Sequence, residues 1–426
     1  AGSTTVDDET VLVTGAADGE AFTANFTDVD GGDYSFDFAV EDTTAEDSDS
    51  INVTELGDGE LSLEESVVSE QQGDIANITV QFNGDAERGN LVIGDEENVG
   101  YQANVSIDSD GEDEVSVLFN TYAAGSTGNG TVVSLANPDD TDASLTFDNA
   151  TDQTDISDIL ADGDYSISVG TQTSFADTLD SPDSLGTLVI EERDTTNQQI
   201  WTASGDTVSD ITDAVSDDEE DVFETLSTEI ENDNVTQTGE IAEGDQVIHQ
   251  IEATGLEGAL SSDSPVVTQE LAALAGNSNG ILSGDSSLGL TVEQTADSTT
   301  ANQDPNDIGA DILANATVLY NDQTDNLYVV YDVSADTAAA AEETYDAEFS
   351  VQDRRLLNPD DNVLDDNTNS EIRSDVYQSV SASFDVAERT FEFDQDPFNV
   401  TNAAGQTITG TSNVAPGSDV TVNVRS

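Results

Sequence analysis

The sequence predicts a mainly β protein built from tandem β-sandwich domains, and three observations support this fold class. Short runs of β-branched and aromatic residues alternate with polar residues, as in strands that bury one face. Gly, Asp, Asn and Pro separate these runs at short intervals. The chain has 426 residues, enough for about two to four domains with separate cores. The clearest strand patterns are at 11–13, 77–82, 115–119 and 327–333.

The charge of the chain predicts the solvent in which it folds. It carries 92 Asp and Glu against seven Arg and no Lys, for a formal net charge of −85 at pH 7. In dilute buffer such a chain repels itself, and intrinsic disorder is the expected state. In molar salt the Debye length falls to about 3 Å, so dispersed surface carboxylates hardly repel one another. The acidic residues interrupt strand patterns rather than forming blocks, which favours a folded protein adapted to brine over disorder.

The composition also narrows the classes of function and partner. The chain has no Cys, which excludes disulfides, thiol catalysis and Cys-ligated zinc. Its charge cannot neutralise phosphates, so we expect no nucleic-acid partner. No apolar run approaches the roughly 20 residues of a membrane span. The start at Ala1 is typical of an exported chain without its signal peptide, although an intracellular protein is also compatible.

An internal repeat predicts the type of sandwich. Residues 30–38 and 162–169 share an Asp/Gly corner, a Tyr and an alternating strand, and a looser copy lies at 345–351. The pattern resembles the tyrosine corner of immunoglobulin-like sandwiches, in which the phenol ties the start of a strand to the preceding loop. A common Gly-Asp-Tyr turn followed by a strand is the simpler alternative. We therefore expect tandem immunoglobulin-like domains.

The patterns divide the chain into four parts. Residues 1–57 form a short N-terminal β domain, 58–195 a sandwich, 196–396 a larger sandwich with helical insertions, and 397–426 the first strands of a further immunoglobulin-like domain. The last of these strands is predicted at 420–424. Because two strands cannot form a core by themselves, this part either pairs with the preceding domain or belongs to a longer protein.

Four segments of the third domain have helical patterns. Apolar residues recur at helical spacing over 208–215 and again over 223–230. Residues 264–276 begin with Ser and Pro and end with Gly, which predicts a third helix. An alanine run after Asp336 predicts another short helix. Because helices and strands do not alternate regularly, this domain is a β sandwich with insertions rather than an α/β fold.

No catalytic set can be assembled from the residues, and we predict that the chain is not an enzyme. The only histidine, His249, shares a strand face with Val247 and Ile251, which is typical of a half-buried structural histidine. Trp201 is interpreted as a core or interface anchor, with a sugar-stacking platform as the alternative. Paired carboxylates occur throughout, so a glycosidase-like pair cannot be recognised.

Two acidic loops are candidate sites for structural Ca²⁺ or Mg²⁺. Residues 108–114 place hard oxygen ligands at alternate positions in a predicted hairpin loop, and 358–367 have similar content. In so acidic a chain such clusters also arise as ordinary solvated loops, and this alternative stays open. The candidate ligands are Asp108, Asp110, Glu112, Asp360, Asp361 and Asp365.

Nine N-x-Ser/Thr sequons occur, against roughly six expected by chance from the Asn, Ser and Thr content, and the small excess favours N-linked glycans on an exported protein. Asn77 and Asn104 lie within strand patterns, so their side chains would have to face outward. The sequon asparagines are Asn25, Asn52, Asn77, Asn104, Asn129, Asn149, Asn234, Asn315 and Asn399.

Five segments spread over most of the chain beyond about residue 60 carry a family resemblance. They are 87–94, 117–125, 186–193, 245–256 and 408–417. In these segments the chain resembles the haloarchaeal surface-layer (S-layer) glycoproteins, whereas the first fifty or so residues match least. The resemblance implies an extracellular, glycosylated cell-wall protein of a halophilic archaeon, built from immunoglobulin-like domains. It also implies that copies of the protein assemble into a two-dimensional lattice around the cell, supported by divalent cations. For the membrane, the resemblance implies attachment only through a C-terminal anchor outside this sequence.

Two other functions remain compatible with the sequence. A secreted adhesin or filament subunit from the same environment would share the charge, the sequons and the sandwich domains. A secreted hydrolase would need a localised carboxylate pair in a cleft with an aromatic floor, and the chain contains a single Trp.

Overall fold

The computed structural model of the chain comprises two compact units, Ala1–Asp58 and Gly59–Ser426. Among the described residues, strands predominate in both units, as the sequence predicts. Among the described helices, none has the length and apolar content needed to cross a membrane. The residues that the structure describes are 2–7, 10–14, 32–40, 43–53, 59–126, 131–139, 141–156, 159–216, 219–260, 264–276, 288–295, 305–334, 339, 342–353, 356–357, 377–395, 399–423 and 425.

The first unit contains two antiparallel hairpins. β1 (Gly2–Asp7) pairs with β2 (Thr10–Thr14), and β3 (Gly32–Ala39) pairs with β4 (Glu46–Val53). The predicted strand at 11–13 lies in β2. The first copy of the repeat lies in β3, with Tyr34 near its start.

The second unit begins with a sandwich of a four-stranded and a six-stranded sheet, which share one apolar core. The four-stranded sheet contains, in spatial order, β11 (Val133–Leu135), β10 (Glu114–Asn120), β7 (Ile75–Asn83) and β5 (Glu60–Leu63). The six-stranded sheet contains β12 (Ser144–Thr146), β9 (Gln102–Asp108), β8 (Arg88–Gly94), β13 (Gly163–Gly170), β14 (Ser184–Glu191) and β6 (Val67–Gln71). Two short helices, α1 (Glu96–Val99) and α2 (Phe175–Asp180), follow β8 and β13.

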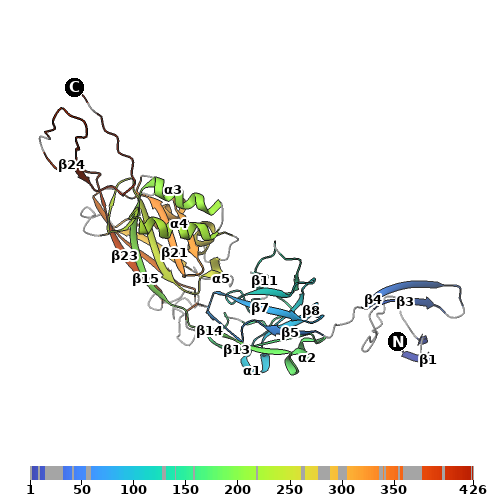
Figure 1. Ribbon diagram of the computed structural model, residues 1–426. Coiled ribbons are helices and arrows are strands. Elements are labelled where there is room, and N and C mark those ends of the chain that lie inside the picture. Colours follow the sequence, from blue (N-terminus) through green and yellow to red (C-terminus); the bar gives the residue numbers. More distant parts are fainter. Residues whose placement is uncertain are drawn as a thin grey trace, which may run out of the picture. The chain divides into compact units, whose positions relative to one another are not determined.

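The connectivity of this first sandwich is that of an immunoglobulin-like domain (Figure 1). β5, β7 and β10 take the places of strands A, B and E in one sheet, and β8, β9, β13 and β14 take those of C, C′, F and G in the other. β6 pairs parallel with β14. The first edge strand is therefore divided into two parts, β5 in the four-stranded sheet and β6 in the six-stranded sheet. The predicted fold class is therefore confirmed here.

The tyrosine corner predicted from the repeat is present in this sandwich. Tyr165 lies near the start of β13, which takes the place of strand F, and its phenol donates to the carbonyl oxygen of Ala161 at 2.9 Å. The Tyr165 ring is 6% exposed and belongs to the apolar core. The phenol thus fixes the entry of the chain into β13, as in other immunoglobulin-like domains.

Replacing this phenol is expected to have a modest effect. We predict that Tyr165→Phe lowers the free energy of unfolding by about 1 kcal/mol, because one neutral hydrogen bond to Ala161 is lost while the ring keeps its packing. Chemical denaturation in molar NaCl, followed by circular dichroism, would measure the change. Unchanged stability would mean that the bond to Ala161 contributes nothing to the corner.

The second sandwich also pairs two sheets. The five-stranded sheet contains β16 (Val235–Gln237), β15 (Thr195–Ala203), β18 (Gln246–Ala253), β21 (Asn326–Asp332) and β20 (Thr317–Asn321). The four-stranded sheet contains β17 (Glu240–Ala242), β23 (Gln378–Ala387), β22 (Glu343–Val351) and β19 (Leu288–Gln294). β15, β18, β21 and β20 reproduce the order A-B-E-D, and β19, β22 and β23 reproduce C-F-G. The third copy of the repeat begins at Tyr345 near the start of β22, which again takes the place of strand F.

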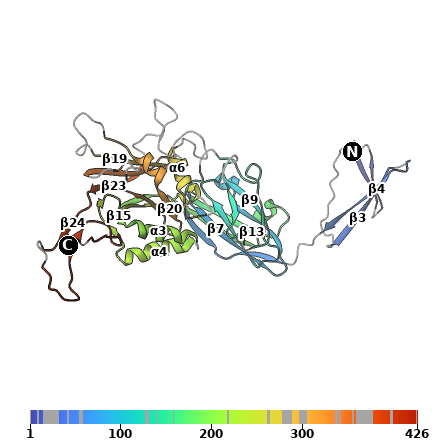
Figure 2. The same ribbon diagram turned by 90° about the horizontal axis from the view of Figure 1, so that it is seen from above.

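Two helices cover the outer face of the five-stranded sheet. α3 (Gly205–Asp213) continues into η1 (Ala214–Ser216) and is followed by α4 (Glu219–Glu231). Figure 2 shows the resulting three layers: the sheet with β19 and β23, the sheet with β15 and β20, and the helices α3 and α4. The helices predicted at 208–215 and 223–230 are therefore confirmed, as is the helical insertion in a β sandwich.

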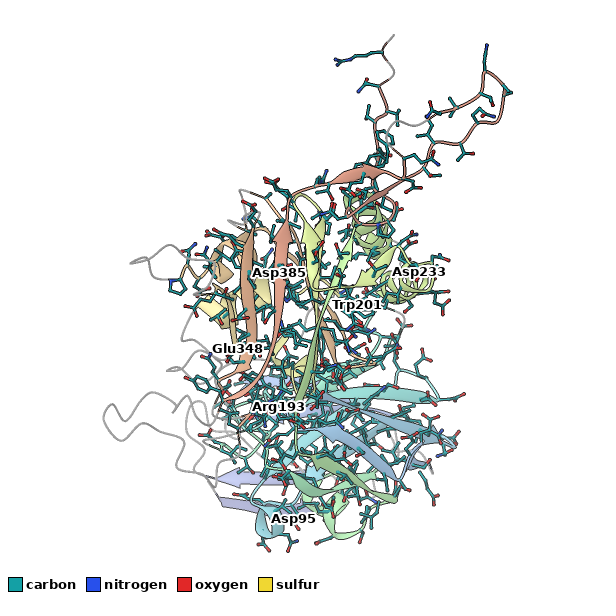
Figure 3. The ribbon with its side chains drawn as sticks, turned by 90° about the vertical axis from the view of Figure 1, so that its left-hand side faces the viewer. Asp95, Arg193, Trp201, Asp233, Glu348 and Asp385 are labelled. Atoms are coloured by element: carbon teal, nitrogen blue, oxygen red, sulfur yellow. The ribbon has the colours of Figure 1, made fainter. Side chains whose placement is uncertain are left out.

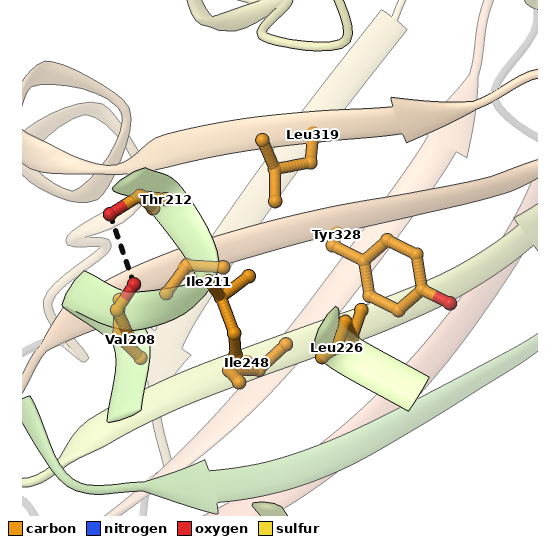
Figure 4. A pocket seen from close by; sticks show the side chains of 8 residues that line it. Val208, Ile211, Thr212, Leu226, Ile248, Leu319 and Tyr328 are labelled. Atoms are coloured by element: carbon orange, nitrogen blue, oxygen red, sulfur yellow. Dashed lines mark hydrogen bonds between the residues drawn. The ribbon is translucent and has the colours of Figure 1, made fainter. Parts of the chain in front are cut away.

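The helices pack closely against this sheet (Figure 4). A cavity of only about 10 Å³ remains between them, close to the volume that holds one water molecule. Its lining is almost entirely apolar, and the Thr212 hydroxyl in it donates to the carbonyl oxygen of Val208 at 3.0 Å. The lining residues are Val208, Ile211, Thr212, Leu226, Ile248, Leu319, Tyr328 and Val330.

The other helical predictions have mixed outcomes. The helix predicted at 264–276 is α6, and it begins later, at Thr268 (Thr268–Gly276). The preceding residues pair with the edge of β20, since the Tyr320 amide donates to Pro265 O and the Val267 amide donates to Val318 O, both at 2.9 Å. The pairing of these residues with β20 therefore prevents the helix from beginning at the Ser-Pro signal in the sequence. Two short helices, α5 (Glu257–Leu260) and α7 (Gly309–Asn315), are not predicted. The alanine run after Asp336 lies largely outside the described residues.

The end of the chain forms one small hairpin, in which β24 (Phe391–Phe393) pairs antiparallel with β25 (Gly410–Ser412). The strand predicted at 420–424 does not form, because residues 420–423 have no regular secondary structure. Val420 and Val422 are 63% and 79% exposed. A strand needs a neighbour for its backbone hydrogen bonds, and the pairing of β24 with β25 is the one that the described residues form here.

Candidate functional site at the joint between the two sandwiches

The predicted cation ligands are not gathered into a metal site in the described part of the chain. Asp108 ends β9 and accepts a hydrogen bond from Nε of Arg88 at 2.8 Å. Asp110 and Glu112 lie exposed in the turn that follows. The described residues hold no group of three or more His, Asp and Glu that could bind a metal ion. The other candidates, Asp360, Asp361 and Asp365, lie outside the described residues, so cation binding stays a prediction.

The sequon asparagines that the structure describes differ in accessibility. Asn77 is exposed between the buried Ala76 and Ile78 of β7, so its side chain faces outward as glycosylation requires. Asn104 of β9 is half-buried, and its amide oxygen accepts from Nε2 of Gln102 at 2.8 Å. Asn315 and Asn399 are exposed, Asn149 and Asn234 are half-buried, Asn52 lies in β4, and Asn25 and Asn129 lie outside the described residues.

His249 and Trp201 have structural surroundings. His249 is fully buried rather than half-buried, and its ring nitrogens contact the Gln198 amide nitrogen at 3.0 Å and the Tyr331 hydroxyl at 2.8 Å. Burial lowers the pKa of His249 from 6.5 to about 3, which keeps the imidazole neutral. Trp201 is half-buried against the helix-covered core, and its indole nitrogen donates to Gln250 at 3.0 Å. Both residues therefore stabilise the second sandwich.

A short linker with a buried arginine joins the two sandwiches. Only residues 192–194 separate β14 from β15. Arg193 in this linker is 2% exposed and lies where the two sandwiches meet (Figure 3). Its Nε donates to Thr254 O at 2.9 Å, and its other nitrogens donate to Thr195 Oγ1 at 2.7 Å and to the Gln378 amide oxygen. These acceptors all belong to the second sandwich, so the linker is held against it.

A reciprocal exchange of hydrogen bonds links the β6–β7 turn to the start of α5. Asp74 of the turn is 2% exposed, and its two carboxylate oxygens accept from the amides of Gly255 at 2.7 Å and Glu257 at 3.0 Å. In return, the Glu257 carboxylate accepts from the Ile75 amide at 2.8 Å. Carboxylates in this arrangement satisfy backbone donors that would otherwise be buried without partners.

Glycine makes this close approach possible. Gly73 has a φ of 106°, and a Cβ built on it would lie 2.2 Å from the carbonyl oxygen of Gly255. A Cβ on Gly258 would lie 2.5 Å from the carbonyl oxygen of Gly73, which accepts a hydrogen bond from the Gly258 amide at 2.9 Å. The two backbones therefore touch directly, without side chains between them.

A third contact comes from the end of β10 and the segment that follows it. The side-chain amide of Asn120 donates to Gly258 O at 3.0 Å, and the Tyr122 hydroxyl donates to the Asp353 carboxylate at 2.7 Å. Tyr122 and Ile159 of the first sandwich belong to the same apolar cluster as the core of the second sandwich. We call this whole contact, made by residues 72–75, 120–122, 192–194, 254–258 and Asp353, the joint.

Five carboxylates line an open cleft of about 430 Å³ beside the joint: Glu70, Asp74, Glu257, Asp322 and Asp325. Burial, reinforced by the neighbouring negative charges, raises the pKa of Glu70 to about 7 and that of Glu257 to about 8. Burial also raises the pKa of Asp74 to about 7, although its two amide donors and Arg193 act in the opposite direction. Some of these groups therefore hold protons near neutral pH.

The chain matches one family model and several haloarchaeal relatives. Residues 53–172, which contain most of the first sandwich, match a family model described as a domain of unknown function (DUF7827). A "Cell surface glycoprotein" of Haloferax gibbonsii is 35% identical over 339 residues, or 79% of this chain and 34% of that protein. "Cell surface glycoprotein 1" of Haloarcula hispanica is 32% identical over 332 residues, or 75% of this chain and 33% of that protein.

Solved structures are matched only distantly. A marsupial T cell receptor is 8% identical with a TM-score of 0.17, and the polymeric immunoglobulin receptor ectodomain of a teleost fish is 8% identical with a TM-score of 0.23. Each match covers 77% of this chain and 98% of the other. The sheet topology identifies the fold, and the sequence identities identify the relatives, of whose length the chain spans about a third. The chain belongs to the family of haloarchaeal cell surface glycoproteins.

Proposed function

We propose that this chain is part of a structural, non-enzymatic protein whose copies form a two-dimensional S-layer lattice around a halophilic archaeon. The observation that carries the proposal is the 35% identity, over 79% of the chain, with a haloarchaeal cell surface glycoprotein. Because the chain spans 34% of that relative, the contacts of the whole protein are part of the proposal. Exposed sequon asparagines such as Asn77 and Asn315 would carry glycans on its surface.

The joint supports a structural role. Two domains on one chain normally move relative to each other unless their interface is extensive. Here a linker of three residues, a buried Arg193 and direct backbone contacts at Gly73 and Gly258 restrain that motion. A lattice requires subunits that keep a constant shape, and a fixed joint contributes such constancy.

Divalent cations are the proposed partners at the contacts between copies. The sequence carries 85 net negative charges, so two copies that meet face to face bring carboxylates against carboxylates. Monovalent salt screens their repulsion but does not connect them. Ca²⁺ or Mg²⁺ binds carboxylate oxygens from both sides and would connect the two faces.

Chelation of divalent cations is expected to dissolve the lattice while the domains stay folded. The test is electron microscopy of cell envelopes in molar NaCl, before and after addition of a chelator. Circular dichroism of the released protein would report whether its β structure survives. The same chelator preloaded with Ca²⁺ is the control, since it adds the chelator to the solution without withdrawing divalent cations from the lattice.

Two results would count against the proposal. Sheets that stay intact in excess chelator would exclude metal bridging between copies. One-dimensional fibres, in place of a sheet of repeating units, would indicate a filament subunit.

A further inference from the structure

The joint brings carboxylates from both sandwiches into one cleft. Glu70 of β6 and Asp74 of the β6–β7 turn come from the first sandwich. Glu257 of α5 comes from the second, as do Asp322 and Asp325 of the turn between β20 and β21. Any repulsion among these groups therefore acts across the contact between the two domains.

Little positive charge faces this cluster among the described residues. Arg193 interacts electrostatically with Asp74, and it also faces Asp194 and the Tyr320 hydroxyl. The donors of Arg193 are directed to neutral acceptors, including Thr254 O and Thr195 Oγ1. Among the described groups, this guanidinium interacts with Asp74 of the five carboxylates, so full ionisation of the cluster leaves a large excess of negative charge at the joint.

We propose that the joint is a proton-dependent lock. It holds the two sandwiches at a fixed angle while the five carboxylates of the cleft share protons, and it loosens when all five ionise. The hydrogen bonds that cross the joint give the closed state. The Glu257 carboxylate accepts from Ile75 with one oxygen, which leaves the other oxygen free to carry a proton. Protonated Glu257 therefore keeps the bond to Ile75 and loses its repulsion of Asp74 and Glu70.

The direction of the pH effect follows from the raised pKa values. Glu257 and Glu70 bind protons more tightly in the closed joint, with pKa values of about 8 and 7, than their ordinary value of 4.5. Their contribution to the closed state is fully present below the ordinary pKa and is lost as the pH rises through 7 to 8. Each unit of pKa difference changes the ratio of closed to open joints about tenfold, so we expect a decrease of at least roughly tenfold between pH 5.5 and pH 9.

Distances between spin labels on the two sandwiches can measure this ratio. The chain has no Cys, so cysteines introduced at the exposed Glu97 of α1 and Ser381 of β23 would be the only labelled sites. Pulsed electron paramagnetic resonance of the whole chain in molar NaCl should give one narrow distance distribution at pH 5.5. At pH 9 a broad second component should appear.

Neutral variants separate the lock from other effects of pH. Glu257→Gln keeps an amide oxygen for the Ile75 amide but never ionises, so its distribution should stay narrow at pH 9. Glu70→Gln should act in the same direction and serves if the first variant does not fold. Glu114→Gln, at an exposed position of β10 outside the cleft, is the control and should behave as the unchanged chain does. Identical distributions at both pH values, or equal broadening in all three variants, would overturn the proposal.

Discussion

Dialysis of the protein from molar NaCl into dilute buffer is expected to unfold it, with loss of the circular dichroism of its sheets. The Debye length grows from about 3 Å at 1 M to about 30 Å at 0.01 M salt, so each carboxylate then repels many others. The sheets place like charges together. In the sheet of β19, β22 and β23, Glu293 stands directly opposite Asp346, and Asp385 and Glu348 lie on the same sheet (Figure 3). Opposed like charges destabilise a sheet, and only screening removes that effect.

Comparison of NaCl with an uncharged cosolute tests whether screening of the carboxylates is what keeps the protein folded in brine. Sucrose at the water activity of the brine also favours compact states, but it carries no charge and does not shorten the Debye length. We therefore expect NaCl to restore the β spectrum after dialysis and sucrose to fail. A spectrum that is unchanged at low salt, or full recovery in sucrose, would contradict the role given to the net charge of −85.

Local patterns were sufficient to predict the clearest strands and the tyrosine corner. In β7, Ile78 and Val80 are fully buried and alternate with more exposed neighbours. This alternation of apolar and polar residues can be recognised in the sequence. The bond from Tyr165 to Ala161 spans four residues, so its motif is local as well. The helices α3 and α4 were predictable because their apolar residues recur at helical spacing over two or more turns.

The joint could not be predicted, because its contacts join distant parts of the chain. Asp74 binds the amides of Gly255 and Glu257, which are 181 and 183 residues away in the sequence. In the sequence alone, Asp74 stands in a Gly-Asp pair like many others, and nothing distinguishes it from a solvated carboxylate. The helix α5 has four residues, too few for a periodic pattern. The one available signal was Arg193 itself, a rare cation placed between two strands of an acidic chain.

Removal of the buried guanidinium is expected to have the largest effect of any single substitution at the joint. We predict that Arg193→Met lowers the free energy of unfolding by about 3–5 kcal/mol, because buried acceptors lose a charged donor while the side-chain volume is nearly kept. These acceptors include Thr254 O, Thr195 Oγ1 and the Gln378 amide oxygen. Denaturation in molar NaCl, followed by the fluorescence of the single Trp201 on the adjoining β15, measures the loss.

The chain supplies its own matched control for this substitution. Arg88 donates to Asp108 at 2.8 Å, but its side chain is 60% exposed, and molar salt screens such a surface pair. Arg88→Met is therefore expected to change the stability by no more than about 1 kcal/mol. If Arg193→Met had an equally small effect, the buried bonds of the linker would not hold the second sandwich at the joint. A large difference between the two variants would instead locate the stabilisation in the burial of Arg193, since both substitutions remove the same charge from the chain.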